Sequence, residues 1–283
     1  MCSTLKLGRI FGIETYIHWS FWILLLWIVL QALGQGGLAA AVSATGFVMA
    51  IFFCVYLHEL GHAMTARQYG IQTLDISILP IGGLARLERM PKSPIAEFWI
   101  AIAGPAVNVV IALVLASLFG IKVVIANMQN ADILSHSLLL QLVAINVSLA
   151  VFNMFPALPM DGGRILRSLL QLRMSRLRAT EVAARVSRYL AGVLIIAGFI
   201  YGFHLVLIGV FVLIAGFQEL MMARVEHLRE QGMQSPGGSV YQDVPMSSGY
   251  QSWPPESFGG RQQRPPVDGE GDVLDATEVR RIP

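Results

Sequence analysis

Charged residues are scarce in this chain. Only 13% of its 283 residues are Asp, Glu, Lys or Arg, whereas 55% are hydrophobic, and the mean hydropathy is +0.62. Soluble domains contain about one-quarter charged residues, so the composition excludes an ordinary soluble domain and indicates an integral membrane protein. The net charge of +2 is too small to indicate a nucleic acid as partner.

Cysteine is also nearly absent. The chain has two cysteines, Cys2 at the terminus and Cys54 within an apolar run. This number excludes a disulfide framework and a metal site built from cysteine. Lys6 and Arg9 precede the first apolar stretch, but no small-residue cleavage pattern follows it, so we expect a retained first span rather than a removed signal peptide.

Long apolar runs, by contrast, fill most of the chain up to residue 223. A helix that crosses a bilayer needs about 20 mostly apolar residues. Gly202 is expected to break the last long run into a hairpin of two helices. The predicted fold class is therefore an all-α integral membrane protein with six transmembrane helices. These helices are expected at residues 16–33, 42–68, 98–126, 133–155, 182–201 and 204–223.

Basic residues are distributed unevenly between the expected spans. The segment 164–188 contains seven arginines and one acidic residue, and more basic residues follow the second and sixth spans. The turns that would face the opposite side, near residues 34–41 and at Gly202, carry no charge. Because short basic loops stay on the cytoplasmic side, both termini are predicted to be cytoplasmic.

Two segments do not fit the pattern of a membrane span. Residues 74–78 and 84–89 alternate with the period of a strand, and Gly82 and Gly83 between them allow a sharp reversal. This predicts a small β-hairpin at the cytoplasmic face, with a plain connecting loop as the alternative. Residues 229–283 are rich in Pro, Gly, Ser and Gln, so a disordered tail is expected after a membrane-embedded domain at residues 1–228.

The sequence HELGH places polar groups in the second expected span. His58 and His62 are four residues apart, so both imidazoles project from one helix face and can bind a single Zn²⁺. Glu59 is rotated by about 100° from His58, beside the metal, where it can take a proton from water. Hydrogen-bonded packing residues are the alternative, but ionisable residues within membrane spans are functional by default.

Asp161 is the best candidate for a third ligand. It follows the fourth expected span, which ends in a proline-rich stretch, and Gly162 and Gly163 are expected to let the chain turn sharply there. If the second and fourth spans run in the same direction, Asp161 lies at the same cytoplasmic depth as His58 and His62. The alternative is that Asp161 only caps the helix that follows.

The chain resembles the site-2 protease family of intramembrane zinc metalloproteases. The resemblance covers about residues 7–223 and rests on the segments HELGH, LPIGG, AGPAVN and NMFPALPMDGGRIL. It implies one Zn²⁺ ion held by His58, His62 and Asp161, with Glu59 as general base, and transmembrane segments of other proteins as substrates. It also implies that Asn153 orients the substrate or steadies an oxyanion.

The similarity is greatest to the six-span bacterial branch, which implies a bacterial inner membrane. Members of that branch carry a cystathionine-β-synthase-type domain, and other members carry a PDZ-like insertion. Neither is expected here, so no nucleotide sensing is predicted. The lipid bilayer and a membrane-protein substrate are the expected partners, and the oligomeric state is left open.

Two further polar residues are weaker candidates for positioning the substrate. His18 lies at the cytoplasmic start of the first expected span, where a histidine beside Trp19 is ordinary at a membrane interface. Asn108 lies in AGPAVN, where Gly104 and Pro105 loosen the helix and small residues permit close packing. Packing is the leading interpretation of Asn108, and an indirect catalytic role is the alternative.

The leading functional prediction is a zinc-dependent intramembrane endopeptidase, to which the hairpin at residues 74–89 would present an unwound substrate as an added strand. Two other classes stay open. A membrane metal transporter would use the histidines and the aspartate for transit, although no repeat relates residues 1–113 to 114–223. A catalytically silent membrane scaffold is the other alternative.

Overall fold

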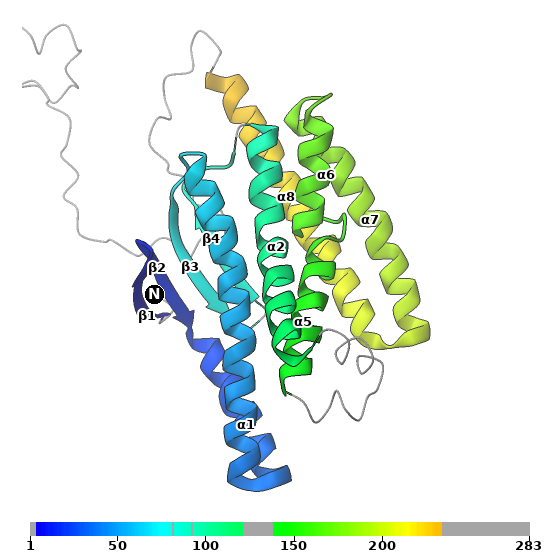
Figure 1. Ribbon diagram of the computed structural model, residues 1–283. Helices are drawn as coiled ribbons and strands as arrows, with labels where there is room; N and C mark the ends of the chain where they lie inside the picture. Colours follow the sequence, from blue (N-terminus) through cyan, green and yellow to red (C-terminus); the bar gives the residue numbers. More distant parts are fainter. Residues whose placement is uncertain (1–3, 81, 92, 121–137, 234–283) are drawn as a thin grey trace, which may run out of the picture. The chain divides into compact units, whose positions relative to one another are not determined.

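The computed structural model describes residues 4–80, 82–91, 93–120 and 138–233, in which helices predominate and four strands form one sheet (Figure 1). The helices are α1 (Trp19–Gln68), α2 (Pro94–Phe119), α5 (Leu138–Asn153), α6 (Asp161–Gln171), α7 (Arg176–Tyr201) and α8 (Phe203–Met233). The strands are β1 (Thr4–Ile10), β2 (Ile13–His18), β3 (Thr73–Leu79) and β4 (Gly82–Leu87).

Helix α1 contains 50 residues but folds back on itself near its middle (Figure 1). Gly36 and Gly37 leave the helical conformation, and Gly37 has φ of 68°, which only glycine adopts readily. The rings of Phe21 and Phe52 are 4.7 Å apart, whereas a straight helix would separate them by about 46 Å. Helix α1 therefore consists of two antiparallel arms, before and after the glycine pair, as the uncharged turn at residues 34–41 predicts.

The prediction of a mostly helical fold with a small β-hairpin is confirmed, but the sheet is larger than predicted, because the amino-terminal residues also form strands. The sheet has the order β1-β2-β3-β4, and β2 pairs in parallel with β3, so that Tyr16 lies opposite Ser77. Strand β2 buries Ile13, Thr15 and Ile17 on one face, against the second arm of α1. The first helix consequently begins at Trp19 instead of residue 16, because partners distant in sequence decide the conformation of this apolar segment.

The hairpin predicted from residue alternation is present as β3 and β4, so the alternative of a plain loop is wrong. Buried Asp75 on β3 accepts a hydrogen bond of 2.9 Å from Nε of Arg86 on β4. This bond raises the pKa of Arg86 above its usual value. Asp75 is thus engaged within the sheet and does not compete with Asp161 as a metal ligand.

Four described helices, α1, α2, α7 and α8, are long and apolar enough to cross a membrane. Helix α5 is apolar but has 16 residues. The spans predicted at residues 98–126 and 133–155 extend into residues 121–137, which lie outside the described residues. The length and apolar character of these helices are those of an integral membrane protein. The total of six spans stays a prediction.

The break predicted at Gly202 is confirmed. Helix α7 ends at Tyr201 and α8 begins at Phe203, and Gly202 between them has φ of 141°. Helix α8 continues to Met233, beyond the predicted domain boundary at residue 229. The remaining part of the predicted tail, residues 234–283, lies outside the described residues.

Candidate metal centre

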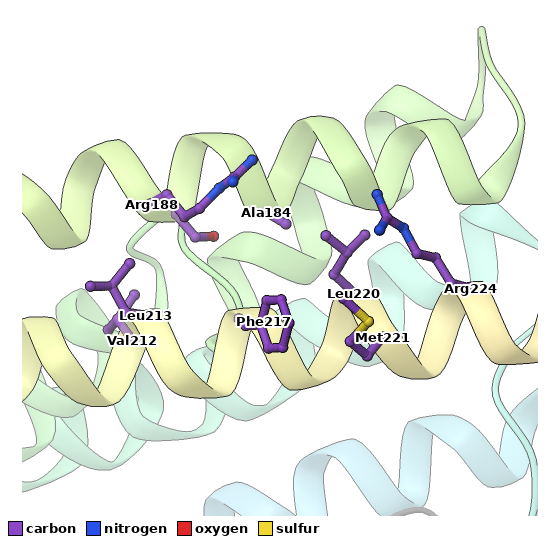
Figure 2. A pocket seen from close by; sticks show the side chains of 10 residues that line it. Ala184, Arg188, Val212, Leu213, Phe217, Leu220, Met221 and Arg224 are labelled. Atoms are coloured by element: carbon purple, nitrogen blue, oxygen red, sulfur yellow. The ribbon is translucent and has the colours of Figure 1, made fainter.

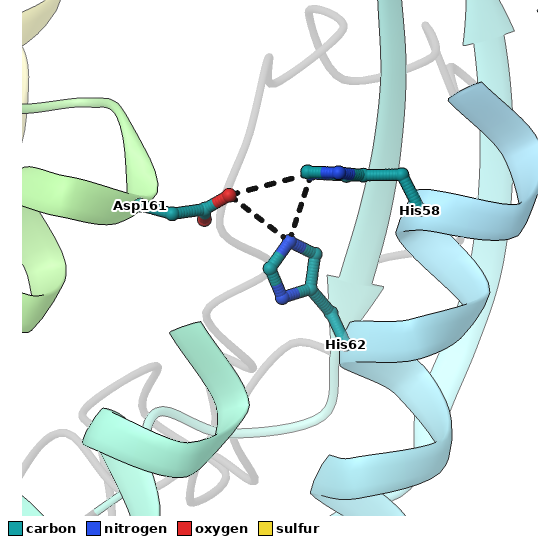
Figure 3. Close-up of side chains that lie close together, drawn as sticks. All are labelled: His58, His62 and Asp161. Atoms are coloured by element: carbon teal, nitrogen blue, oxygen red, sulfur yellow. Dashed lines mark hydrogen bonds and ion pairs between the residues drawn. The ribbon is translucent and has the colours of Figure 1, made fainter. Parts of the chain in front are cut away.

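Three buried side chains from α1 and α6 meet at one point (Figure 3). The Nε2 atoms of His58 and His62 are 3.1 Å apart, and Oδ2 of Asp161 lies 3.3 Å from the first and 3.2 Å from the second. Within the described residues, this is the one group of three or more His, Cys, Asp or Glu side chains placed to hold a metal ion. We call it the His–His–Asp triangle.

The two histidines lie on successive turns of the second arm of α1, as the spacing of four predicts. Nδ1 of His58 is 2.5 Å from Oδ1 of Asn108, and Nδ1 of His62 is 2.6 Å from the carbonyl oxygen of Ile100. Both partners accept, so each Nδ1 carries the proton and each Nε2 keeps its lone pair. These bonds orient both lone pairs towards Asp161, as ligand histidines require.

Asp161 is the first residue of α6, and the N-cap position is occupied by Met160 without any side-chain cap. The interpretation of Asp161 as a simple helix cap is therefore wrong. Its carboxylate instead faces the two imidazoles across the interface of α6 with α1 (Figure 3). Residues of two segments that are far apart in the sequence therefore come together, as a shared metal site requires.

Gly162 and Gly163 have a different role from the predicted sharp turn. Both lie within α6, and neither has a positive φ. A Cβ on Gly162 would lie 2.3 Å from the carbonyl oxygen of Met154, and one on Gly163 would lie 2.4 Å from the nitrogen of Leu158. Because they lack side chains, the two glycines let the preceding proline-rich loop pack closely against α6. This packing fixes the position of Asp161, the first residue of the helix.

Helix α2 approaches the triangle at Gly104, a residue without a side chain. A Cβ on Gly104 would lie 2.2 Å from Nε2 of His62 and 2.7 Å from Nε2 of His58. A Cβ on Gly61 would likewise lie 2.8 Å from Val107 of α2, which confirms the predicted close packing of small residues. The backbone of α2 therefore forms one wall of the candidate site.

Asn108 belongs to a hydrogen-bond chain that leads away from His58. Its amide nitrogen donates to Oδ1 of Asn146 over 2.9 Å, and Asn146 donates to the carbonyl of Leu142 and, over 3.3 Å, to Sγ of Cys54. Both asparagines are fully buried. The contact of Asn108 with His58 favours an indirect catalytic role of Asn108 over a role in helix packing alone. Asn146 was not predicted, although an asparagine within an apolar run is a usable signal.

Glu59 lies beside the triangle but is not one of its three members. Its Oε2 accepts a hydrogen bond of 3.2 Å from the backbone N–H of Ala85 in β4. A Cβ on Gly83 would lie 2.5 Å from Cγ of Glu59, so β4 packs directly on this side chain. The sheet therefore holds the carboxylate next to the candidate metal site.

The other two predicted residues make local contacts. His18 is the N-cap of α1, where Nδ1 accepts from the backbone N–H of Ser20 over 3.3 Å. The side chain of Asn153 donates to the carbonyl of Leu149 over 3.0 Å at the end of α5. The structure thus gives both residues a helix-terminal role, and a part in substrate positioning stays a prediction.

The triangle matches the requirements of a zinc ion. In a tetrahedral site with bonds of about 2.0–2.1 Å, two ligand atoms lie about 3.3 Å apart. The three separations in the triangle are 3.1, 3.2 and 3.3 Å. Two imidazole nitrogens and one carboxylate oxygen leave a fourth position open. Fold and site together define a membrane protein with a buried His₂Asp group that fits a metal ion.

A separate cavity of about 140 Å³ lies between α7 and α8. Figure 2 shows its wall, in which Arg188 and Arg224 flank apolar side chains such as Phe217 and Leu220. No member of the His–His–Asp triangle lines it. Gly216 in its wall packs near the carbonyl of Leu158, in the loop that precedes α6.

Comparison with known proteins places the chain in a family. The model of peptidase family M50 matches residues 46–197, more than half of the chain, and the chain belongs to this family. The chain is 34% identical over 227 residues to the zinc metalloprotease MJ0392 of Methanocaldococcus jannaschii, which covers 80% of this chain and 63% of that protein. It is also 34% identical to the putative zinc metalloprotease Rip3 of Mycobacterium tuberculosis, over 77% of this chain and 59% of that protein.

A solved structure shares the fold. The site-2 protease from Methanocaldococcus jannaschii superposes with a TM-score of 0.55 at 34% identity, covering 77% of this chain and 95% of that one. The curated relatives are longer, since this chain spans about 60% of the length of the two described above. The resemblance to the site-2 protease family is therefore confirmed at the level of family and fold.

Proposed function

We propose that this chain is a zinc-dependent endopeptidase that cleaves transmembrane segments of other membrane proteins. The observation that carries the proposal is the His–His–Asp triangle, whose donor separations suit tetrahedral zinc. Two members of the triangle lie on α1, and α2 forms one wall of the site; both helices are apolar enough to cross a bilayer. Membership of peptidase family M50 and relatives named as zinc metalloproteases support the same activity.

In this proposal one zinc ion is held by His58, His62 and Asp161. Bound zinc supplies Lewis acidity, which makes a neighbouring water more acidic and polarises the scissile carbonyl. Glu59 accepts the proton of the attacking water and returns it to the leaving amine. The hydrogen bond from Ala85 directs its carboxylate, so that the base does not need to reorient during the reaction.

Strand β4 offers a way to hold the substrate. It is an edge strand of the sheet, and its Ala85 N–H points away from β3 towards Glu59. A transmembrane helix hides its peptide bonds in its own hydrogen bonds, so the scissile segment has to unwind. We infer that the unwound segment pairs with outward-facing groups of β4 other than the Ala85 N–H, which stays bonded to Glu59.

Substrate peptides with a single N-methylated backbone position test this pairing without altering the enzyme. In a strand only alternate N–H groups face a neighbour. Methylation is therefore expected to lower the cleavage rate at every second position around the scissile bond, where the N–H would face β4. Methylation at the positions between them is expected to leave the rate unchanged. An equal effect at all positions, or none, argues against strand pairing.

The catalytic role of Glu59 has a direct test. In cells that express a cognate membrane substrate, Glu59→Gln is expected to abolish the cleaved fragment, because general-base catalysis contributes about 10²–10⁴-fold. The purified variant is expected to retain its zinc, because Glu59 is not in the triangle. Cleavage by Glu59→Gln at the wild-type rate would refute the mechanism. Zinc binding without any cleavage by the wild type would favour a metal transporter or a silent scaffold.

We also propose six spans with both termini in the cytoplasm of a bacterium. The uncharged turn at Gly202 and the arginine-rich start of α7 support this orientation. Single cysteines introduced at Gly202 and at Ser175 provide the test, once Cys2 and Cys54 are replaced. A membrane-impermeant maleimide applied outside the inner membrane is expected to label residue 202 and not residue 175.

A further inference from the structure

A second buried polar cluster lies where α2, α6 and α8 meet. Arg167 of α6 is 3% exposed, and its Nε and Nη2 both contact Oε1 of Glu97 in α2, the first at 2.7 Å. Its Nη1 contacts Oε1 of Glu219 in α8 at 2.6 Å. Gln171, one turn further along α6, donates to the other oxygen of Glu97 over 2.9 Å. Both oxygens of Glu97 are therefore held by α6.

Stability alone does not explain this cluster. Removing a charge from water costs several kcal/mol, and apolar residues of similar volume serve stability equally well or better. Buried ion pairs do fix one arrangement of their elements, and the planar arginine fork defines direction as well as distance. The question is which arrangement needs to be fixed.

The cluster connects the helix that carries Asp161 to the helix that orients His58 and His62. Helix α6 begins at Asp161, about 9 Å along the axis from Arg167. Helix α2 orients the histidines through Ile100 and Asn108, and Glu97 lies one turn before Ile100. An ion pair between Arg167 and Glu97 thus joins the helix that carries the third candidate ligand to the helix that orients the first two.

We propose that Arg167 is a positioning residue for the metal centre, which holds α6 against α2 so that the carboxylate of Asp161 stays within reach of both imidazoles. This inference rests on the zinc ligands proposed above. Arg167 touches neither the zinc nor the substrate and acts only through Asp161. Its contribution to metal binding therefore depends on the presence of that carboxylate.

The test is a double-mutant cycle on zinc affinity, measured by chelator competition with the purified full chain. Arg167→Met is expected to weaken zinc binding about 10–100-fold, the range for residues that orient ligands. Arg167→Lys is expected to restore only part of this loss, since an ammonium group lacks the fork. In the background of Asp161→Ala, Arg167→Met is expected to change zinc affinity less than about twofold, because no carboxylate is left to position.

Equal losses of zinc affinity in both backgrounds would show that Arg167 supports only the general fold, and would overturn the inference. Unchanged affinity in folded Arg167→Met would overturn it as well. Glu181→Gln is the matched control, because it removes the carboxylate of a half-exposed α7–α8 ion pair with Arg224 and is expected to leave zinc affinity unchanged. This control distinguishes an effect specific to Arg167 from the general effect of losing an ion pair between two helices.

If Arg167→Met does not fold, Glu97→Gln takes its place in the same cycle. This substitution keeps the volume of the side chain but weakens its bond to Arg167, so a smaller loss of zinc affinity is expected, again only when Asp161 is present. No loss in folded Glu97→Gln would refute the inference. Because every readout is metal affinity, the result is independent of whether Glu59→Gln abolishes proteolysis.

Discussion

The two halves of the candidate metal centre are built in different ways. His58 and His62 lie on one helix, so α-helical geometry alone brings their rings together. Asp161 reaches them from the start of another helix, after a loop that packs against glycine backbone. The histidine half is thus defined locally, whereas the aspartate half depends on tertiary contacts. Substitutions that disturb one half at a time test this difference.

The largest effect on metal binding is expected from Gly104→Ala. The added methyl group would occupy the space of both Nε2 atoms, at 2.2 and 2.7 Å, and would displace the histidine half directly. Zinc affinity is expected to fall by more than about 100-fold, beyond the usual effect of a residue that only orients ligands. Gly46→Ala in α1 is the control, because nothing lies within 4 Å of its added Cβ. Similar affinities of both variants would contradict the described approach of α2.

Gly163→Ala perturbs the aspartate half. Its Cβ would meet the backbone of the loop before α6, and such overpacking costs about 1–3 kcal/mol. We expect a lower unfolding temperature together with weaker zinc binding, measured by thermal shift and chelator competition. Gly192→Ala in α7 has open space at its Cβ and is expected to be neutral or stabilising. If Gly163→Ala lowers stability without weakening zinc binding, the loop does not position Asp161.

Asn108→Ala removes the acceptor that orients His58 while leaving all three candidate ligands in place. Zinc affinity is expected to fall about 10–100-fold. Asn108→Asp keeps an acceptor for Nδ1 of His58 and should retain more affinity than the alanine variant. Asn153→Ala, which removes a bond to the carbonyl of Leu149, is expected to leave zinc affinity unchanged.

The smallest effect is expected from Thr15→Val. Thr15 and Tyr56 share a buried hydroxyl contact of 3.4 Å between β2 and α1, and neither residue belongs to the triangle. Its loss is expected to lower the free energy of unfolding by about 1 kcal/mol, with no change in zinc affinity. A clear loss of zinc binding in this variant would mean that the sheet and the histidine half are coupled more tightly than the contacts indicate.

Much of the fold followed from local patterns in the sequence. The reversal at residues 34–41, the break at Gly202 and the strands of the β3–β4 hairpin were predicted, because glycine and residue alternation act over short distances. Strands β1 and β2 were missed. The predicted first span began at residue 16, inside β2, and only the pairing of β2 with β1 and β3 makes residues 16–18 part of a strand.

For the site, the sequence identified the three members of the triangle and the adjacent Glu59. Their supporting residues were harder to predict. The contact of Gly104 with the imidazoles, the bond from Asn108 to Asn146 and the partners of Arg167 all join segments that are far apart in the chain. No spacing rule covers such contacts, because they depend on how the helices pack.

The sequence by itself determined that the chain is apolar enough for a membrane, that two histidines share one helix face, and that an acidic residue lies in a comparable setting. Only the tertiary structure decided that Asp161 faces those histidines and that α2 orients their rings. The physical reason is the distance along the sequence over which each kind of interaction acts. Helical periodicity fixes neighbours within a few residues, whereas the distance between α1 and α6 is set by glycine contacts and buried charges that exist only once the helices have packed.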